Sequence, residues 1–248
     1  MRFLCSIAPH VDSRTTIDFV YTDSKSAFKT MQHDMLLSVL PRKGVGPRLR
    51  SWISSFLTNR RFRVKVRSSL SGTGHPNTGC PQGTVLGSLL FLLFIDDVRL
   101  LLDGRVEYFF ADDVKMVKVI RGPSDCVDLQ RVLNDFACWS SRMGLVLSAP
   151  KCGFLRIGPD IDAAPPYHIN DVPLKRLSNV RDLGVFLDDS LGFSIHVRII
   201  VSKCSTVCSW ILRSFSICDA DVYTRLFNSY VSPILEYACQ VWRPHMKC

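Results

Sequence analysis

The sequence predicts an α+β fold, in which a small antiparallel sheet is backed by helices and followed by a mostly helical C-terminal portion. Short runs of apolar residues at 17–22, 106–110 and 114–120 have the length and composition of strands. Between 129 and 143, by contrast, large apolar residues recur at helical spacing. From Gly192 onward the pattern is mainly helical. With 248 residues, 47% of them hydrophobic, the chain can bury a substantial core.

The predicted elements follow one another along the chain. Pro47 suits the first position of a helix, because its missing N–H would have no helical partner there. The cluster at 79–83 contains two glycines and a proline, and it predicts a turn that opens the next helix. In the first half of the chain we expect a strand at 17–22, a helix at 33–40, a helix from Pro47, a strand at 62–66 and a buried helix from 84 to about 101. The helix from Pro47 would carry its apolar residues on one face: Leu49, Trp52, Ile53, Phe56 and Leu57. In the second half we expect a hairpin of 106–110 and 114–120, a helix across 129–143, short strands around 153–157 and 183–187, and helices from 192 to 241. A boundary near Ala163 divides the chain into 1–162 and 163–248.

The net charge of +9 is concentrated in one stretch. Between residues 35 and 95 there is no Asp or Glu, whereas these basic residues fall there: Arg42, Lys43, Arg48, Arg50, Arg60, Arg61, Arg63, Lys65 and Arg67. A surface this one-sided attracts polyanions, of which nucleic acid is the commonest inside cells. The alternative is a solvated basic face that keeps the protein soluble. Trp52, Phe56 and Phe62 lie among the charges, where they suit base stacking or the buried side of a helix.

Three features predict an intracellular protein and leave nucleus and cytoplasm open. The longest apolar run, 85–95, is shorter than the roughly 20 residues that span a bilayer, so we expect no membrane insertion. The N-terminus reaches His10 and Asp12 before a signal core forms. Ten cysteines occur without a CxxC pair, which favours reduced thiols over a disulfide framework or a zinc site.

The most informative residues are Asp112 and Asp113, adjacent carboxylates at the tip of the predicted hairpin. Adjacent anions repel unless a cation neutralises them, so the pair predicts a divalent metal site. Asp23, at the end of a predicted strand, would share that site if the strands were neighbours, and two Mg²⁺ ions about 3.5–4 Å apart serve phosphoryl transfer. The alternative is that Asp112 and Asp113 only form a turn, where Asp is favoured anyway. Asp188-Asp189 is similar but is not followed by a second apolar strand.

A series of further motifs extends from about Asp18 to Pro244. In order, they are Tyr21-Thr22-Asp23 through Ala27-Phe28, 33–37, 52–60, 79–87, Phe110-Ala111-Asp112-Asp113, Lys151-Cys152, 182–185 and 233–238. Together they resemble the reverse transcriptases of non-long-terminal-repeat (LINE-type) retrotransposons. The resemblance implies the palm and a partial thumb of an RNA-directed DNA polymerase, with the fingers and endonuclease regions missing.

The resemblance also implies roles for individual residues. Asp23, Asp112 and Asp113 would hold two Mg²⁺ ions, with Mn²⁺ as the alternative metal. The main-chain carbonyl of Ser24 would be a further ligand. Lys151 would protonate the leaving pyrophosphate.

Contacts with the nucleotide and the nucleic acid follow from the same resemblance. Phe28 would exclude a ribose 2′-hydroxyl, and Gln82 and Gly83 would pack against the deoxynucleoside triphosphate and the template base. Leu183 and Gly184 would grip the end of the DNA primer. The residues expected on the phosphates of the RNA template or the primer are Arg42, Lys43, Arg48, Arg50, Arg60, Arg61 and Arg63.

Two departures from the family pattern bear on activity. Lys29 stands where the family has an acid, and an ammonium there would pair with Asp23 and compete with Mg²⁺. Only 22 residues precede Asp23, so we expect 1–162 to be a truncated fingers and palm region. The missing fingers segment would lie in a full-length parent protein. Residues 163–248 would form the end of the palm and a thumb-like helical region. Two other functions stay open: a catalytically decayed fragment that binds nucleic acid, and a two-metal nuclease, which would leave 79–87 unexplained.

Overall fold

The structure is a computed structural model that describes residues 9–10, 13–102, 107–110, 113–161, 167–215 and 219–242, with the backbone only at 99–101 and 107–109. The chain forms two compact units. One comprises Asp18–Phe154 and Ile161–Arg176, and the other comprises Met1–Ile17, Leu155–Asp160 and Leu177–Cys248.

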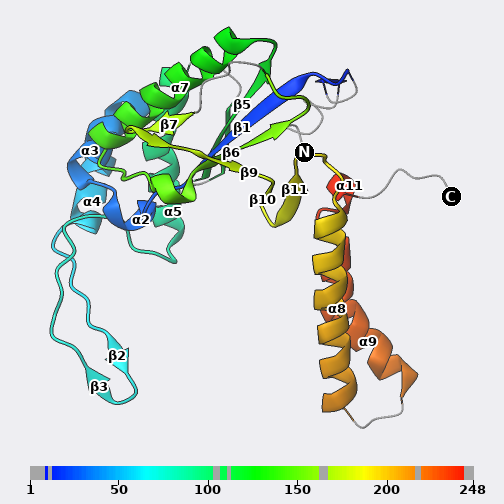
Figure 1. Cartoon of the computed structure of the whole chain (residues 1–248). Helices are drawn as coiled ribbons and strands as arrows, with labels where there is room; N and C mark the ends of the chain where they lie inside the picture. Colours follow the sequence, from blue (N-terminus) through cyan, green and yellow to red (C-terminus); the bar gives the residue numbers. More distant parts are fainter. Residues whose placement is uncertain are drawn as a thin grey trace. The chain divides into compact units, whose positions relative to one another are not determined.

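A five-stranded sheet forms the centre of the fold, in the order β4-β5-β1-β6-β9 (Figure 1). Its strands are β1 (Thr16–Thr22), β4 (Glu107–Phe110), β5 (Asp113–Ile120), β6 (Gly153–Ile157) and β9 (Lys175–Leu177). β4 and β5 form an antiparallel hairpin in which Phe110 lies opposite Asp113. Both the strand predicted at 17–22 and the hairpin are therefore confirmed. β1 lies between β5 and β6, and nearly all of its residues are buried, so both of its faces are covered by other parts of the chain.

Helices around the sheet supply most of the core. They are α2 (Ala27–Thr30), α3 (His33–Val39), the 3₁₀ turn η1 (Leu40–Lys43), α4 (Pro47–Leu57), α5 (Val85–Ile95), α6 (Asp97–Leu102) and α7 (Pro123–Arg142). Aromatic rings of α5 and α7 meet in the core, where the centroids of Phe94 and Trp139 lie 6.4 Å apart. These helices confirm the predicted α+β class.

Two details of these helices differ from the prediction. The helix expected from 84 to about 101 is interrupted at Asp96, whose carboxylate, together with that of Asp97, pairs with basic residues of η1. On the apolar face predicted for α4, Ile53 and Leu57 are buried, but Trp52 is 55% exposed. Hydrophobic spacing predicted the helix correctly but overestimated the width of its buried stripe.

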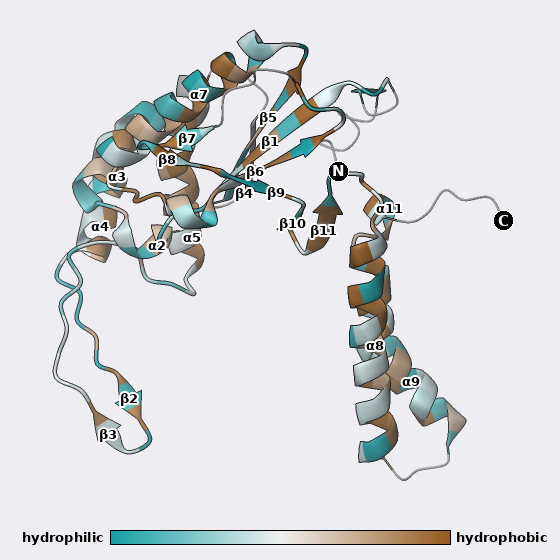
Figure 2. Ribbon diagram, in the orientation of Figure 1, coloured by the Kyte–Doolittle hydropathy of each residue, from teal (hydrophilic) through white to brown (hydrophobic). Residues whose placement is uncertain are grey.

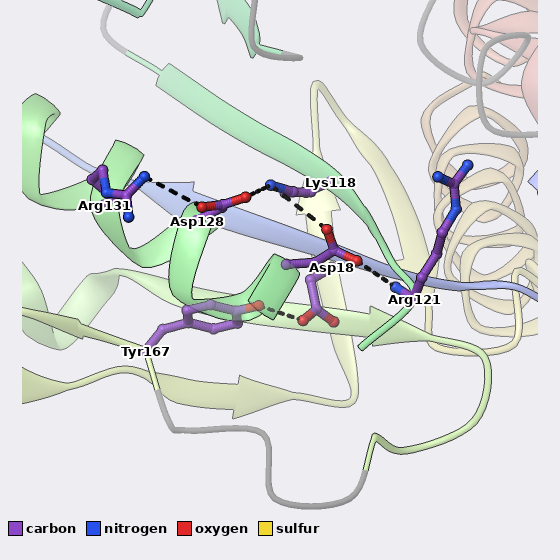
Figure 3. A network of polar contacts seen from close by, with 7 residues as sticks. Asp18, Lys118, Arg121, Asp128, Arg131 and Tyr167 are labelled. Carbon is purple, nitrogen blue, oxygen red and sulfur yellow. Dashed lines mark hydrogen bonds and ion pairs between the residues drawn. The ribbon is translucent and has the colours of Figure 1, made fainter. Parts of the chain in front are cut away.

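A polar network ties α7 to the sheet (Figure 3). Asp128 of α7 accepts a hydrogen bond from Lys118 of β5 at 3.1 Å. On β1, the fully buried carboxylate of Asp18 accepts a hydrogen bond of 2.6 Å from the hydroxyl of Tyr167. Burial and the neighbouring carboxylate raise the pKa of Tyr167 well above its usual range. The phenol therefore stays protonated and remains a donor to Asp18.

A two-stranded arm extends from the first unit between α4 and α5 (Figure 1). It contains β2 (Lys65–Val66) and β3 (Ser69–Leu70), which pair antiparallel. The strand predicted at 62–66 is thus confirmed only at its end. A second short hairpin is formed by β7 (His168–Ile169) and β8 (Val172–Pro173).

The second unit carries a hairpin followed by helices. β10 (Asn179–Asp182) pairs with β11 (Val185–Asp188), and the helices are α8 (Ser194–Ser214), α9 (Ala220–Tyr230), α10 (Ser232–Glu236) and α11 (Cys239–Trp242). This confirms the mostly helical C-terminal portion.

Within the described residues, α8 alone is long and apolar enough, by length and composition, to cross a membrane. It carries hydrophobic and hydrophilic residues along its whole length (Figure 2). Ile200 and Cys204 of α8 pack with Val231 in a small core of their own. Packing within this unit thus accounts for part of the apolar character of the helix.

Candidate active site

The end of β1 and the start of β5 lie side by side. The hydroxyl of Thr22 donates a hydrogen bond of 2.9 Å to the carbonyl of Val114. These two residues directly adjoin Asp23 and Asp113 in the sequence, so the main chain of both acidic residues lies at the same end of the neighbouring strands β1 and β5. Asp113 is exposed there, and Asp112 lies outside the described residues. Two of the three predicted acidic residues are therefore brought together.

Asp23 is held by a segment far away in the sequence. Its carbonyl accepts a hydrogen bond of 2.8 Å from the N–H of Ser148, and Ser24 forms an antiparallel bridge with Leu147. Behind it, burial raises the pKa of the Cys152 thiol, whose Sγ lies 3.4 Å from the N–H of Asp23. The main chain that carries the candidate ligand is thus fixed before any ligand binds.

The same segment brings a cation to the carboxylate. Nζ of Lys151 lies 3.1 Å from Oδ2 of Asp23. That oxygen is buried and lacks a hydrogen bond of good geometry, so the contact is an ion pair rather than a directed hydrogen bond. The structure therefore unites two predicted catalytic residues. Within the described residues no ion pair joins Lys29 to Asp23, although the sequence pattern predicts one.

Among the candidate nucleotide contacts, Phe28 lies next to the turn that carries Gln82 and Gly83. The ring of Phe28 stacks on Phe91 with centroids 4.1 Å apart, which fixes its position. Its carbonyl accepts a hydrogen bond of 3.1 Å from Cys80, so the turn at 79–83 lies beside it. Gly79 has a φ of +71°, and a Cβ there would lie 2.6 Å from the Phe28 carbonyl oxygen. Only glycine fits this position without moving the main chain.

Gln82 and Gly83, at the tip of this turn, are exposed. Gly83 has a φ of +78°, and a Cβ there would meet no atom of the chain within 4 Å. The backbone conformation, rather than a close approach within this chain, therefore explains the glycine.

Sequence reasoning missed an internal role for Arg60. Its guanidinium donates to the carbonyls of Gly79 and Thr78 at 2.6 and 3.2 Å, and Nε2 of buried His33 lies 2.8 Å from the Gly79 carbonyl. Arg60 thus supports the turn at 79–83. Nothing in the sequence separates it from Arg61, because both belong to the same basic run.

The other predicted phosphate contacts have different surroundings. Arg42 forms an ion pair with Asp97, and Nζ of Lys43 lies 2.6 Å from Oδ2 of Asp96. These pairs offset part of the basic charge of η1. Elsewhere, Arg48, Arg61 and Arg63 are exposed, and Arg50 is half-buried.

Leu183 and Gly184 form the two-residue turn between β10 and β11 in the second unit. Both have positive φ, at 45° and 89°, as a hairpin turn of this length requires. The hydroxyl of Tyr237 donates a hydrogen bond of 2.8 Å to the Leu183 carbonyl. Leu183 is nevertheless 48% exposed, so its side chain is open to solvent.

Comparison with known families identifies the family of the chain. The family model for reverse transcriptase (RNA-dependent DNA polymerase) matches residues 9–194. The chain belongs to the reverse transcriptase family. The predicted resemblance is therefore confirmed.

Relatives of this reverse transcriptase chain are polymerases of mobile elements. It is 28% identical to the probable RNA-directed DNA polymerase from transposon X-element of Drosophila melanogaster, over 93% of the chain and 26% of that protein. It is also 28% identical to the RNA-directed DNA polymerase from mobile element jockey of Drosophila funebris, over 90% of the chain and 25% of that protein. The chain thus spans about a quarter of the length of these relatives.

Solved structures show the same fold. A telomerase from Candida tropicalis, in complex with the TWJ fragment of telomeric RNA, covers 97% of this reverse transcriptase chain at a TM-score of 0.51 and 9% identity. The match covers 43% of the telomerase chain. At this identity the likeness establishes the fold alone.

Proposed function

We propose that this reverse transcriptase chain is the catalytic palm of an RNA-directed DNA polymerase, which adds deoxynucleotides to the 3′-hydroxyl of a DNA primer on an RNA template. The main support for the proposal is the contact between Thr22 and Val114, because their sequence neighbours Asp23 and Asp113 then lie at the same end of two adjacent strands. Phe28, five residues after Asp23, stands beside the turn at 79–83 and supplies a surface for the nucleotide.

The donor atoms at this edge suit Mg²⁺. Carboxylate oxygens are its preferred ligands, and the buried Oδ2 of Asp23 has an ion pair with Lys151 but no directed hydrogen bond. Asp23, Asp112 and Asp113, with the main-chain carbonyl of Ser24, would hold two Mg²⁺ ions, or Mn²⁺. When bound, such ions supply activation of the attacking hydroxyl and neutralisation of the leaving pyrophosphate.

The chain's own residues would then position the reactants. The ring of Phe28, fixed by Phe91, would block a ribose 2′-hydroxyl by overlap. Gln82 and Gly83 are exposed on the adjoining turn, where they would face the base pair being formed. Lys151 carries a proton 3.1 Å from Asp23 and would donate it to the leaving group.

The remaining contacts are with the nucleic acid and with the rest of a longer protein. Leu183 and Gly184 would grip the primer end. Because the chain spans about a quarter of the relatives' length, we propose that polymerisation belongs to a retrotransposon-derived parent protein that also supplies the fingers segment.

Primer extension on an RNA template with Mg²⁺ tests this proposal, using the 248-residue chain and a version extended by a fingers segment, with the rates compared in whichever form extends the primer. Asp113→Asn should lower the extension rate by more than about 100-fold, because loss of even an outer contact to a metal ligand costs about 10- to 100-fold. Asp34→Asn, an exposed carboxylate in the first turn of α3, is the matched control and should keep the wild-type rate. Equal rates in the two variants would refute the assignment.

The ion pair between Asp23 and Lys151 favours one alternative, a decayed fragment that only binds nucleic acid, because it neutralises a candidate ligand. Retained binding without extension, by both the chain and a version extended by a fingers segment, would establish that alternative. Template degradation without primer growth would instead indicate a two-metal nuclease.

A further inference from the structure

We propose that the arm at residues 61–74 is a β-ribbon that binds the phosphate backbone of nucleic acid through one basic face, made of Arg61, Arg63 and Lys65 with Arg67 at its tip. This inference deepens the proposed function, because it assigns the contact of the polymerase with its template or primer to one element. It separates the charges of the arm from the other basic residues of the chain.

The register of the ribbon sorts the side chains onto two faces. Successive residues of an extended chain point to opposite faces, and the outgoing segment pairs with the returning one at Phe62 and again at Lys65 and Val66. We infer from this that Arg61, Arg63 and Lys65 share one face and that Phe62, Val64 and Val66 share the other. Directly opposed residues share a face. The hydrogen bond of 2.9 Å from Arg63 Nε to the hydroxyl of Thr73 shows this across the ribbon.

One residue more lies on the returning strand than on the outgoing one. Lys65 pairs with Leu70, whereas Phe62 forms a bridge with Gly74. The register thus shifts by one residue, which marks a bulge that adds twist. A Cβ at position 74 would lie 2.6 Å from the Phe62 ring, so this ring covers the glycine and steadies the base of the arm.

The body of the chain does not cover the arm. All residues from 61 to 73 are exposed (Figure 1 shows the arm extended from the helices). A two-stranded ribbon is at best marginally stable alone in water, so an element like this one gains order from a partner. Three cations at alternate positions of a strand recur about every 6.6 Å, a regular row that suits a polyanion.

Other basic residues of the same stretch are already engaged. Arg42 and Lys43 pair with acidic residues, and Arg60 binds main-chain carbonyls. Within the described part of the chain, no carboxylate forms an ion pair with a cation of the arm. Arg63 bonds a neutral hydroxyl and so keeps its net charge. Four of the six remaining cations of this stretch are therefore located on the arm, and the other two, Arg48 and Arg50, are on α4.

The tip carries an arginine where the backbone favours glycine. Arg67 has a φ of +54° and occupies the first of the two loop residues, Arg67 and Ser68. Loops with a positive φ there take Gly, and the left-handed conformation costs another residue about 1 kcal/mol. Arg67 thus adds a charge at a position where glycine would be more stable, which is expected of a binding residue.

The test measures how binding to a 20-nucleotide RNA depends on salt, without nucleotides, by fluorescence anisotropy. Each phosphate contact to a single strand contributes about 0.7 to the slope of log K against log salt. Replacing Arg61, Arg63 and Lys65 together by Gln should lower the slope by about 2. Raising KCl from about 50 to about 200 mM should then weaken wild-type binding by about 18-fold more than variant binding.

A matched control removes the same charge elsewhere. Replacing Arg121, Arg142 and Lys175 by Gln, all exposed and outside the arm, should leave the slope within about 0.5 of wild type. An equal fall in both triple variants would show an unspecific charge effect and overturn the proposal. So would an unchanged slope in the arm variant.

Arg67→Gly separates binding from folding. It should keep or raise the free energy of unfolding in urea, because it relieves the left-handed arginine, and still lower the slope by about 0.7. A slope that does not change would remove the tip from the site. If instead the arm variants alter the sedimentation coefficient and leave the slope unchanged, the arm is an interface between copies and the proposal fails.

Single-stranded DNA and an RNA–DNA duplex of equal length identify which backbone the arm prefers. Because no nucleotide is present, the assay is independent of catalysis. If the arm variants lower the slope while neither the chain nor a version extended by a fingers segment extends a primer, the arm proposal is supported and the polymerase proposal is refuted. Primer extension without any effect of the arm variants on the slope would give the reverse result.

Discussion

Removing Lys151 should strengthen Mg²⁺ binding at Asp23. The charges lie 3.1 Å apart, at which distance Coulomb's law gives about 1.3 kcal/mol in water. The lysine side chain is 68% exposed and the carboxylate 33%, so the net ion pair is worth less, about 0.5–1 kcal/mol. Mg²⁺ that binds Asp23 must displace this contact. In Lys151→Met we therefore expect a Kd for Mg²⁺ about two- to fivefold lower, measured by isothermal titration calorimetry.

Two further variants make the measurement specific. Asp23→Asn should abolish the titration, which identifies the site. Lys29→Met removes a positive charge six residues along the sequence that is not paired with Asp23, and it should change the Kd by less than Lys151→Met does. Unchanged or weaker Mg²⁺ binding in Lys151→Met would refute the competition. An equal gain in the Lys29 variant would show that the effect is only long-range repulsion.

Three other predictions follow from the contacts. Phe28→Ala should raise ribonucleotide incorporation relative to deoxynucleotide by about 10- to 200-fold in primer extension, because the fixed ring is the proposed barrier; an unchanged ratio would exclude Phe28. Tyr167→Phe should cost about 1–3 kcal/mol of unfolding free energy at neutral pH through the lost bond to Asp18. Folding raises the pKa of Tyr167, so the stabilisation that its protonated hydroxyl gives the folded state is complete below pH 10, near the pKa of an unfolded tyrosine. Above pH 10 this stabilisation is lost by up to about 1.4 kcal/mol per pH unit. Urea unfolding of the wild type and of Tyr167→Phe between pH 8 and 11 should show this loss in the wild type only. Burial and Lys203 lower the pKa of His196, so the folded wild type should lose stability as the pH falls below about 6.5, where an unfolded histidine binds a proton. His196→Phe should remove that loss. An equal fall in melting temperature with pH in the wild type and the variant would contradict the prediction.

Local patterns in the sequence predicted most of the elements that carry the site. The strand before Asp23 and the hairpin that contains Asp113 follow from apolar runs of the right length. That these strands are neighbours does not follow from such runs, because strand order depends on packing between distant segments. The neighbouring positions of these strands were expected only through the family resemblance. The contact of Thr22 with Val114 shows that the strand before Asp23 lies beside the strand that begins at Asp113.

The partner of Asp23 shows why the remainder could not be predicted. Lys29 is six residues away and was expected to pair with the carboxylate. The main chain turns at Ser26, which has a φ of +52°, and then enters α2. Lys151 is 128 residues away, but the bridge between Ser24 and Leu147 brings it to the carboxylate. Separation along the sequence is thus a poor guide to an ion pair wherever strands pair.

Contacts within the chain also reduce the number of basic residues that are available to bind nucleic acid. All charged residues between 35 and 95 are basic, but Asp96 and Asp97 follow immediately and pair with Lys43 and Arg42. With Arg60 bound to carbonyls as well, three of the nine cations are engaged within the chain. The six that remain are Arg48 and Arg50 on α4 and the four of the arm. At about 0.7 per phosphate they would support a salt slope of about 4 for single-stranded RNA, of which the arm would contribute about two-thirds. The arm is therefore the element whose removal should most reduce affinity for nucleic acid.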